Sequence, residues 1–155
     1  MDSKIILRPR PWPAYFLMVV GLFFILFSLQ KGNENFPWII GIAFFLFPLL
    51  LLLLLRKAVI ILTEEGIEYR TLFSTKKILW SSLTRVSFTY AMYGQSGSYD
   101  WHFETASGTT KISTTLYSRR SHKMIAGAVI QQGKIAFAND RVHAMAQGHF
   151  PFYHL

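Results

Sequence analysis

Histidines and carboxylates are the side chains of this sequence that could do chemistry, so their spacing is the starting point. The 155-residue chain contains five histidines: His102, His122, His143, His149 and His154. None belongs to an H-x-x-x-H or H-E-x-x-H pair, the spacings that place two imidazoles together on one helix face around a metal ion. The histidines are therefore predicted to be separate surface side chains, and the sequence indicates no metal site.

Two other motifs lack what an enzyme site needs. Asp100 and Glu104 lie four residues apart in an alternating segment, so they share one face of a predicted strand. Without a charged partner or a pocket, that pattern favours a solvated face over an acid–base pair. The loop from Gly94 to Gly97 lacks the G-x-x-x-x-G-K-[ST] frame of a phosphate loop and is predicted to be a hairpin tip. With no cysteine in the chain, thiol nucleophiles are excluded, and no catalytic residue or cofactor is predicted.

Basic side chains are the strongest candidates for a binding role. The chain has 16 Lys and Arg against 8 Asp and Glu, a net charge of +8. Seven of these cations form the predicted anionic-lipid or partner patch: Arg56, Lys57, Lys76, Lys77, Arg119, Arg120 and Lys123. Each cation near an anionic leaflet would contribute about 1 kcal/mol. The alternative is that these charges only keep the domain soluble and set its topology. No nucleic-acid-binding signature accompanies them, so no nucleic-acid partner is expected.

Two long apolar runs precede most of these residues. Trp12–Leu29 and Phe36–Leu55 contain no charged side chain, and each would reach about 30 Å as a helix, the thickness of a bilayer core. The composition agrees, with 52% hydrophobic residues, 15% charged residues and a mean hydropathy of +0.30. The sequence therefore predicts a two-helix transmembrane hairpin, with helices over 12–30 and 36–55.

Charge and aromatic residues orient this predicted hairpin. Basic residues flank its outer ends, and the connecting loop is neutral, which by the positive-inside rule places both termini in the cytoplasm. Trp12, Tyr15 and Trp38 are predicted to be membrane-interface anchors. A cleaved signal peptide is the alternative for the first run, but no A-x-A-like site follows it.

After Arg56 the pattern changes to alternation of apolar and polar residues. About six short antiparallel strands are predicted, followed by a helix that carries Met124, Ile125, Ala128 and Val129 and stops at Gly133. Ser118 and Ser121 are candidate caps, and a second helix is predicted over Asp140–Gln147, stopped by Gly148. The predicted organisation is a basic arm (1–11), the hairpin (12–55), a β domain with a capping helix (56–133) and an aromatic tail (134–155).

Two of these stretches carry a resemblance to a known family. The T-x-x-G-I turn of Thr63–Ile67 and the junction Trp80–Val86 into the next strand resemble those of bacterial two-span membrane proteins with a pleckstrin-homology-like domain. The resemblance covers residues 1–133 and implies a membrane α-helical hairpin plus an α+β part, a pleckstrin-homology-like antiparallel barrel or sandwich capped by a helix. It also implies a multi-pass protein of the bacterial inner membrane. It carries over no catalytic residues.

These expectations lead to three function hypotheses. The leading one is a non-enzymatic, membrane-anchored interaction module that binds a protein or an anionic lipid at the inner leaflet. The alternative is an immunity protein that binds and neutralises a cognate bacterial toxin. An enzyme is the third hypothesis and lacks any supporting constellation. Homo-oligomerisation is compatible with the sequence.

Overall fold

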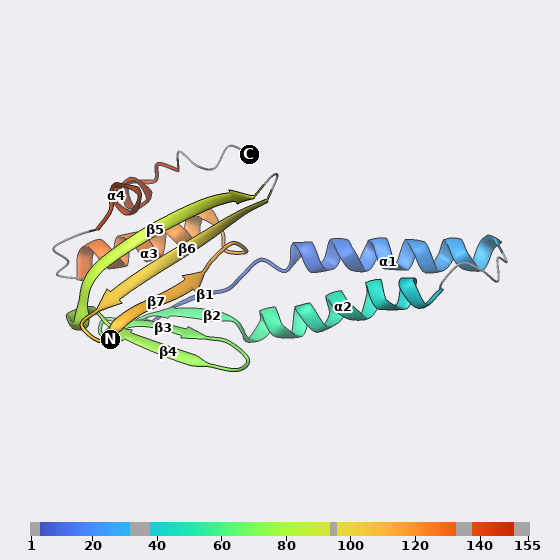
Figure 1. The fold of residues 1–155 in the computed structure, drawn as a ribbon, viewed down its shortest axis with the longest axis horizontal. Helices are drawn as coiled ribbons and strands as arrows, with labels where there is room; N and C mark the ends of the chain where they lie inside the picture. The colour runs from blue at the N-terminus through green and yellow to red at the C-terminus, as the bar shows by residue number, and fades with distance from the viewer. Residues whose placement is uncertain (1–3, 32–37, 94–95, 133–137, 151–155) are drawn as a thin grey trace. The chain divides into compact units, whose positions relative to one another are not determined.

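The chain folds into two units. The structure, a computed structural model, describes residues 4–31, 38–93, 96–132 and 138–150 (Figure 1). One unit is the helical hairpin of residues Arg10–Lys57, and the other combines Met1–Pro9 with Ala58–Leu155. We call them the hairpin unit and the β unit and describe each by itself.

The elements of the described residues, in chain order, are labelled in Figure 1. They are β1 (Ile5–Leu7), α1 (Trp12–Lys31), α2 (Trp38–Lys57), β2 (Val59–Leu62), β3 (Gly66–Arg70), β4 (Thr75–Leu79), the 3-10 turn η1 (Trp80–Ser82), β5 (Leu83–Tyr93), β6 (Ser96–Thr105), β7 (Gly108–Ser113), α3 (Arg119–Gln132) and α4 (Asp140–Gln147).

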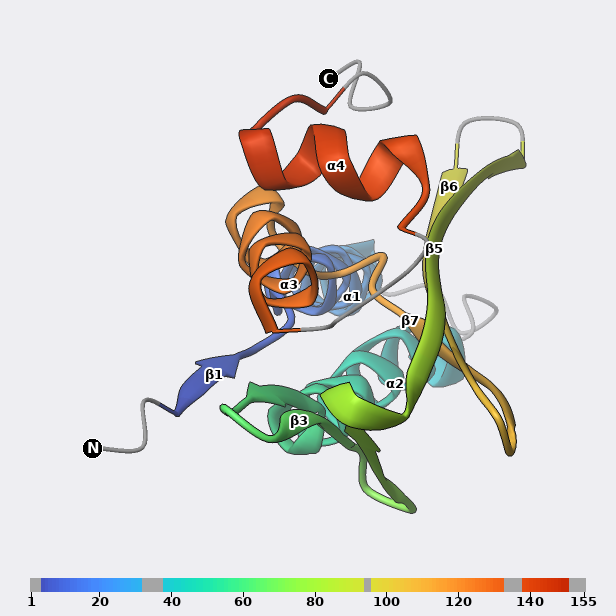
Figure 2. The same cartoon turned by 90° about the vertical axis from the view of Figure 1, so that its left-hand side faces the viewer.

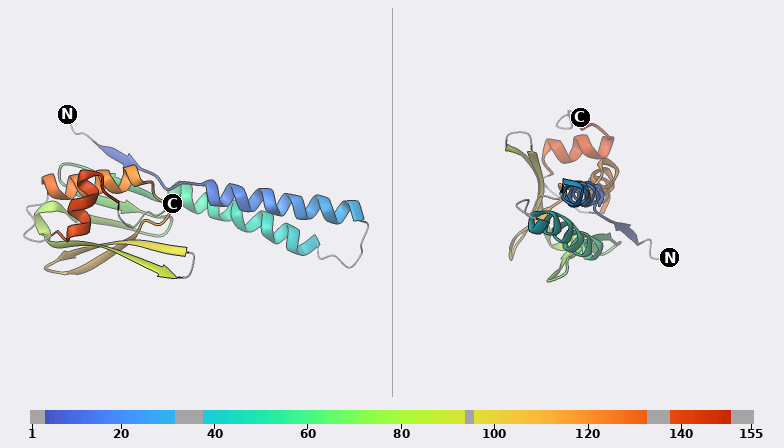
Figure 3. Two further views of the ribbon diagram at one scale, coloured as in Figure 1. Left: turned by 90° about the horizontal axis from the view of Figure 1, so that it is seen from above. Right: turned by 90° about the vertical axis from the view of Figure 1, so that its right-hand side faces the viewer.

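In the hairpin unit, α1 and α2 lie side by side along most of their length (Figure 3). Glycine makes this close approach possible, because a Cβ on Gly21 would lie 2.9 Å from the carbonyl carbon of Phe44. The rings of Phe24 and Phe44 also meet between the helices, with centroids 6.3 Å apart. The hairpin is thus held by apolar packing around a glycine contact.

The predicted membrane hairpin is wrong. In the parts of the chain that the structure describes, no helix combines the length and the apolar character that a membrane crossing requires. The same finding contradicts the predicted multi-pass location in a bacterial inner membrane.

The β unit contains two antiparallel sheets. One has the strand order β1-β2-β3-β4, and the other β5-β6-β7. The turn η1 joins them, between Leu79 of β4 and Leu83 of β5. The described part of the chain is thus an α+β fold of two antiparallel sheets and four α-helices. It replaces the predicted fold class of a membrane hairpin joined to a pleckstrin-homology-like barrel.

The core of the β unit follows from the alternation of the strands. Along β5 and β6, Val86, Phe88, Trp101 and Phe103 are fully buried, and the rings of Phe88 and Trp101 lie 5.3 Å apart in an edge-on contact. Helix α3 adds Ile125, Ala126 and Val129 to the same cluster. Figure 2 shows α3 beside the strands, with α4 packed across it.

Asn139 fixes α4 to the outer edge of β5. Its side-chain amide donates to the Phe88 carbonyl over 3.1 Å and accepts from the Phe88 N–H over 3.4 Å, while its backbone N–H donates to the Val86 carbonyl. The same side-chain oxygen accepts from the Val142 N–H and so caps α4. The predicted helix over 140–147 is present, and Gly148 ends it at a φ of 91°.

Two glycines of the β unit give a matched test of this packing. A Cβ on Gly66 would overlap the Ile78 carbonyl oxygen, whereas a Cβ on Gly127 would meet nothing within 4 Å. Gly66→Ala should therefore lower the free energy of unfolding by about 1–3 kcal/mol. Gly127→Ala in helix α3 should raise it by up to about 1 kcal/mol. Guanidinium denaturation of the full chain, followed by tryptophan fluorescence, measures both, and equal effects would contradict this packing.

Candidate interaction surface

Strand β1 lies at the edge of its sheet. It pairs with β2 on one side, in the register Ile5↔Leu62 and Leu7↔Ile60. Within the described residues, the strand order gives β1 no neighbour on its other side. Backbone N–H and C=O groups on such an edge are available for pairing with another chain.

A groove runs between this edge strand and helix α3. Its volume is about 230 Å³, and it is lined by Ile5, Leu62, Thr63, Glu64, Met124, Gly127, Ala128, Gln131 and Gln132. We call it the β1–α3 groove. Helix α3 begins at Arg119, where the Ser118 hydroxyl caps it by accepting from the Ser121 N–H over 3.0 Å, and its later turns line the groove. The small side chains of Gly127 and Ala128 leave the space above the helix open.

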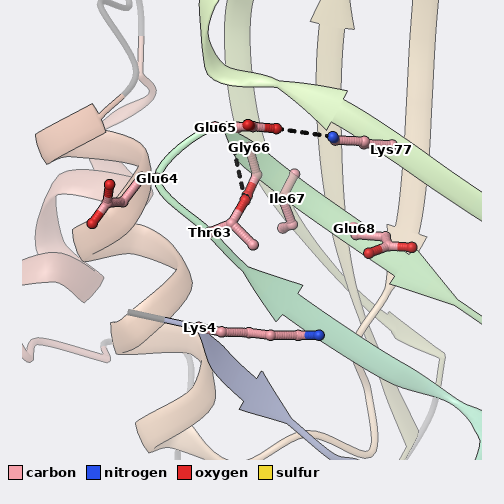
Figure 4. Close-up of a pocket in the computed structure, with 8 residues that line it drawn as sticks. All are labelled: Lys4, Thr63, Glu64, Glu65, Gly66, Ile67, Glu68 and Lys77. Atoms are coloured by element: carbon pink, nitrogen blue, oxygen red, sulfur yellow. Dashed lines mark hydrogen bonds and ion pairs between the residues drawn. The ribbon is translucent and has the colours of Figure 1, made fainter. Parts of the chain in front are cut away.

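A second recess, of about 340 Å³, surrounds the turn between β2 and β3. It is lined by Lys4, Thr63, Glu64, Glu65, Gly66, Ile67, Glu68 and Lys77. Glu65 and Lys77 form an ion pair of 3.0 Å, and Glu64 points to the other side of the turn (Figure 4). The Thr63 hydroxyl donates to the Gly66 carbonyl and accepts from its N–H, which makes the turn rigid. The two recesses share Thr63 and Glu64 and so border each other.

The outer face of β1 is positively charged. Lys4, Ile6 and Arg8 alternate with the inward-facing Ile5 and Leu7, so both cations are exposed on one face. Among the described residues, neither Lys4 nor Arg8 has a carboxylate within ion-pair distance. On β3, the hydrogen bond from Arg70 lowers the pKa of Glu68, and desolvation opposes this shift. The positive charges of Lys4 and Lys77 lower the pKa of Glu68 further.

The polar face of the second sheet brings together neither a catalytic pair nor a metal site. Asp100 is buried and pairs with Lys111 over 2.9 Å, while the Thr89 hydroxyl lies 2.9 Å from the His102 ring. The burial of Asp100 contradicts the predicted solvated face, and the register places Glu104 opposite Thr109. Among the residues that the structure describes, no group of three potential ligands could hold a metal ion.

Of the described histidines, His122 is the one that contradicts the prediction of a surface side chain. It is fully buried in the aromatic core, with ring centroids 5.6 Å from Phe88 and 5.8 Å from Tyr99. Its Nε2 lies 3.2 Å from the Thr114 carbonyl, which can only accept, so Nε2 carries the proton. Burial lowers the pKa of His122 to about 4, against the opposing effect of that hydrogen bond. His154 lies outside the described residues.

The chain matches no family model, no curated protein and no solved structure. The resemblance to two-span proteins with a pleckstrin-homology-like domain therefore stays a prediction.

The seven predicted patch residues do not form one cluster of known geometry. Lys76 and Lys77 are neighbours on β4, so they face opposite sides of the sheet, and Lys77 is paired with Glu65. Arg119, Arg120 and Lys123 share the first turns of α3. Arg56 and Lys57 end α2, in the other unit. The structure thus brings together only the three residues of α3.

Sequence reasoning missed the charged edge strand. Residues 1–11 were predicted to be a basic arm, and β1 covers only Ile5–Leu7. Three residues are too few for a reliable period-two pattern. The alternation of Lys4, Ile6 and Arg8 around the inward-facing Ile5 and Leu7 was the available signal.

The buried His122 predicts a loss of stability in acid. Because its pKa lies near 4 in the fold and at about 6.5 in the unfolded chain, the unfolded state takes up a proton first as the pH falls. His122 therefore lowers the free energy of unfolding from pH 6.5 downward, by roughly 3 kcal/mol in all. His122→Gln should flatten this part of the stability profile, as measured by denaturant unfolding from pH 4 to 7. The control is His143→Gln, at an exposed position, which should leave the dependence of stability on pH unchanged.

Proposed function

We propose that this chain is a non-enzymatic binding module that packs its helical hairpin against a helix of another protein subunit. The observation that carries the proposal is a stripe of exposed apolar side chains along α1. Five of them recur at alternating spacings of four and three residues and are between 57% and 66% exposed: Trp12, Phe16, Val19, Phe23 and Leu26. This is the heptad spacing with which one helix packs along another.

Helix α2 has a similar stripe. Its exposed apolar residues at the same spacings are Ile42, Leu46, Leu49 and Leu53. Exposed apolar surface of this extent on a folded chain is typical of an interaction site. Both helices of the hairpin therefore present a stripe of exposed apolar side chains to which a partner can bind.

The free energies of burial and of association indicate that a partner covers both apolar stripes. A fully buried side chain of this kind contributes about 2 kcal/mol, so covering the exposed part of the five side chains in the α1 stripe is worth about 6 kcal/mol. Association costs about 4–15 kcal/mol in lost freedom of motion. One stripe alone would barely offset that cost, and we infer that the partner covers residues of both helices.

The chemistry of the described polar side chains supports a role without catalysis. Asp100 is held by Lys111, and His122 is neutral in the core. In the part of the chain covered by the structure, no nucleophile, base and orienting group converge as an enzyme site requires. Binding is therefore the function that these residues support best.

Photo-crosslinking tests the proposal directly, because the chain has no cysteine of its own. A benzophenone maleimide attached to Val19→Cys should crosslink the full-length chain, purified in mild detergent, to a second polypeptide. Thr109→Cys, exposed on β7, is the control and should give no such product. Mass spectrometry of the product distinguishes a second copy of this chain, a toxin and any other protein, each of which supports the proposal. Adducts to lipid or detergent alone would overturn it.

Truncation of one side chain in the stripe gives a second, quantitative test. Phe23→Ser should reduce the amount of retained partner by about tenfold or more, since burying this ring contributes about 1.5–3 kcal/mol. Phe23→Leu keeps most of the apolar surface and should retain the partner. The Phe23 side chain is 64% exposed, and its ring contacts with Phe24 and Phe27 lie within α1. The free energy of unfolding should therefore change by about 1 kcal/mol at most. Equal retention by the two variants would exclude this face of α1.

A further inference from the structure

We propose a second binding site, in the β unit and independent of the hairpin. The outer edge of β1, together with the β1–α3 groove, takes an extended segment of a partner protein in which apolar residues alternate with acidic ones. The segment adds to the sheet as a strand beside β1. Its apolar side chains enter the groove, and its acidic side chains lie opposite Lys4 and Arg8.

The backbone of β1 supports strand addition. Among the described residues, β1 has a single strand neighbour, and Ile5 and Ile6 are 37% and 51% exposed. An edge strand of this kind pairs readily with an added strand through its free backbone groups. β1 contains neither a proline nor a bulge, two features that block strand addition.

The groove selects apolar residues at every second position of the added strand. Ile5 faces inward and lines the groove, together with Met124 and Ala128 of α3. Gly127 leaves open space at the centre of this wall. Side chains of a neighbouring strand on the inward face would fill that space, since they project beside Ile5 and Leu7.

The outward face selects acidic residues at the alternate positions. Lys4 and Arg8 lie on either side of Ile6 on one face of the strand. Directly opposite side chains of adjacent strands have Cβ atoms about 4.5–5.5 Å apart, which suits an ion pair. Lysine on an edge strand can also serve only to repel other strands. The groove beside β1 favours recruitment over repulsion, because a merely protected edge needs no recess next to it.

The chain itself shows how such an edge is covered elsewhere in the β unit. Ala138 forms a parallel bridge with Val86 on the outer edge of β5, and Asn139 bonds the next outward-facing groups, those of Phe88. In the described residues, β1 has no corresponding cover.

Peptide binding to the full chain tests the site. The probe is a fluorescein-labelled seven-residue peptide of alternating glutamate and valine, compared with a block peptide of the same composition and an alternating lysine–valine peptide. We expect the alternating acidic peptide to bind at least tenfold more tightly than either control, by fluorescence anisotropy. It should also slow hydrogen exchange of the outward-facing amides of β1. Equal binding of the alternating and block peptides would overturn the proposal.

Two sets of substitutions separate the groove from the charges. Gly127→Leu should fill the groove and weaken binding at least tenfold, whereas Gly127→Ala should not, and the unfolding midpoint of each variant verifies its fold.

The double substitution Lys4→Glu with Arg8→Glu, at exposed positions, tests the charges. This variant should no longer bind the acidic peptide and should bind the lysine–valine peptide instead. Unchanged binding by Gly127→Leu would overturn the proposal. So would sedimentation with phosphatidylglycerol vesicles that depends on Lys4 and Arg8 without any peptide binding. These variants should leave the crosslinking at Val19→Cys unchanged. The experiments can therefore reject either proposed site without rejecting the other.

Discussion

The arrangement of the β unit depends on how Trp80 holds the turn between β2 and β3. The indole N–H donates to the Thr63 carbonyl over 2.9 Å, and the Trp80 backbone N–H donates to the Glu65 carbonyl over 3.0 Å. Trp80 lies in η1, the link between the two sheets, so these bonds fix the turn to the sheet junction. Because Gly66 packs against the Ile78 backbone, little room remains for movement. Trp80 thus holds in place the turn that contains Thr63 and Glu64, the two residues that border both recesses.

The two units offer a partner different physical interactions. The stripes of the hairpin unit consist of apolar side chains, so their contacts are non-directional and scale with the area that they bury. The edge of the β unit presents backbone groups and cations, and its contacts depend on direction and register. A protein with both surfaces could hold one partner strongly through the first and select among partners through the second.

Much of the β unit could be predicted from the sequence because local patterns decide it. The alternation of Val86, Phe88, Trp101 and Phe103 marks two half-buried strands, and Ser118 and Gly148 mark helix ends by their chemistry.

Other features depend on contacts between distant residues and leave no local signal. The hydrogen bonds between Asn139 and Phe88 and the burial of His122 against Tyr99 are of this kind. The same holds for the separation of the basic residues, which a count of charge cannot show. The apolar runs predicted helices, but not where their charged ends fall.

The connection between β1 and β2 has a consequence for folding. These paired strands are joined through the whole hairpin unit, Arg10–Lys57, so their pairing closes a loop of that length. A flexible loop resists such closure through its entropy, whereas two helices that already pack against each other bring its ends together beforehand. The glycine contact between α1 and α2 therefore favours the pairing of β1 with β2, because it lowers the entropy cost of closing the loop between them. Assembly of this sheet edge should wait until the hairpin has formed.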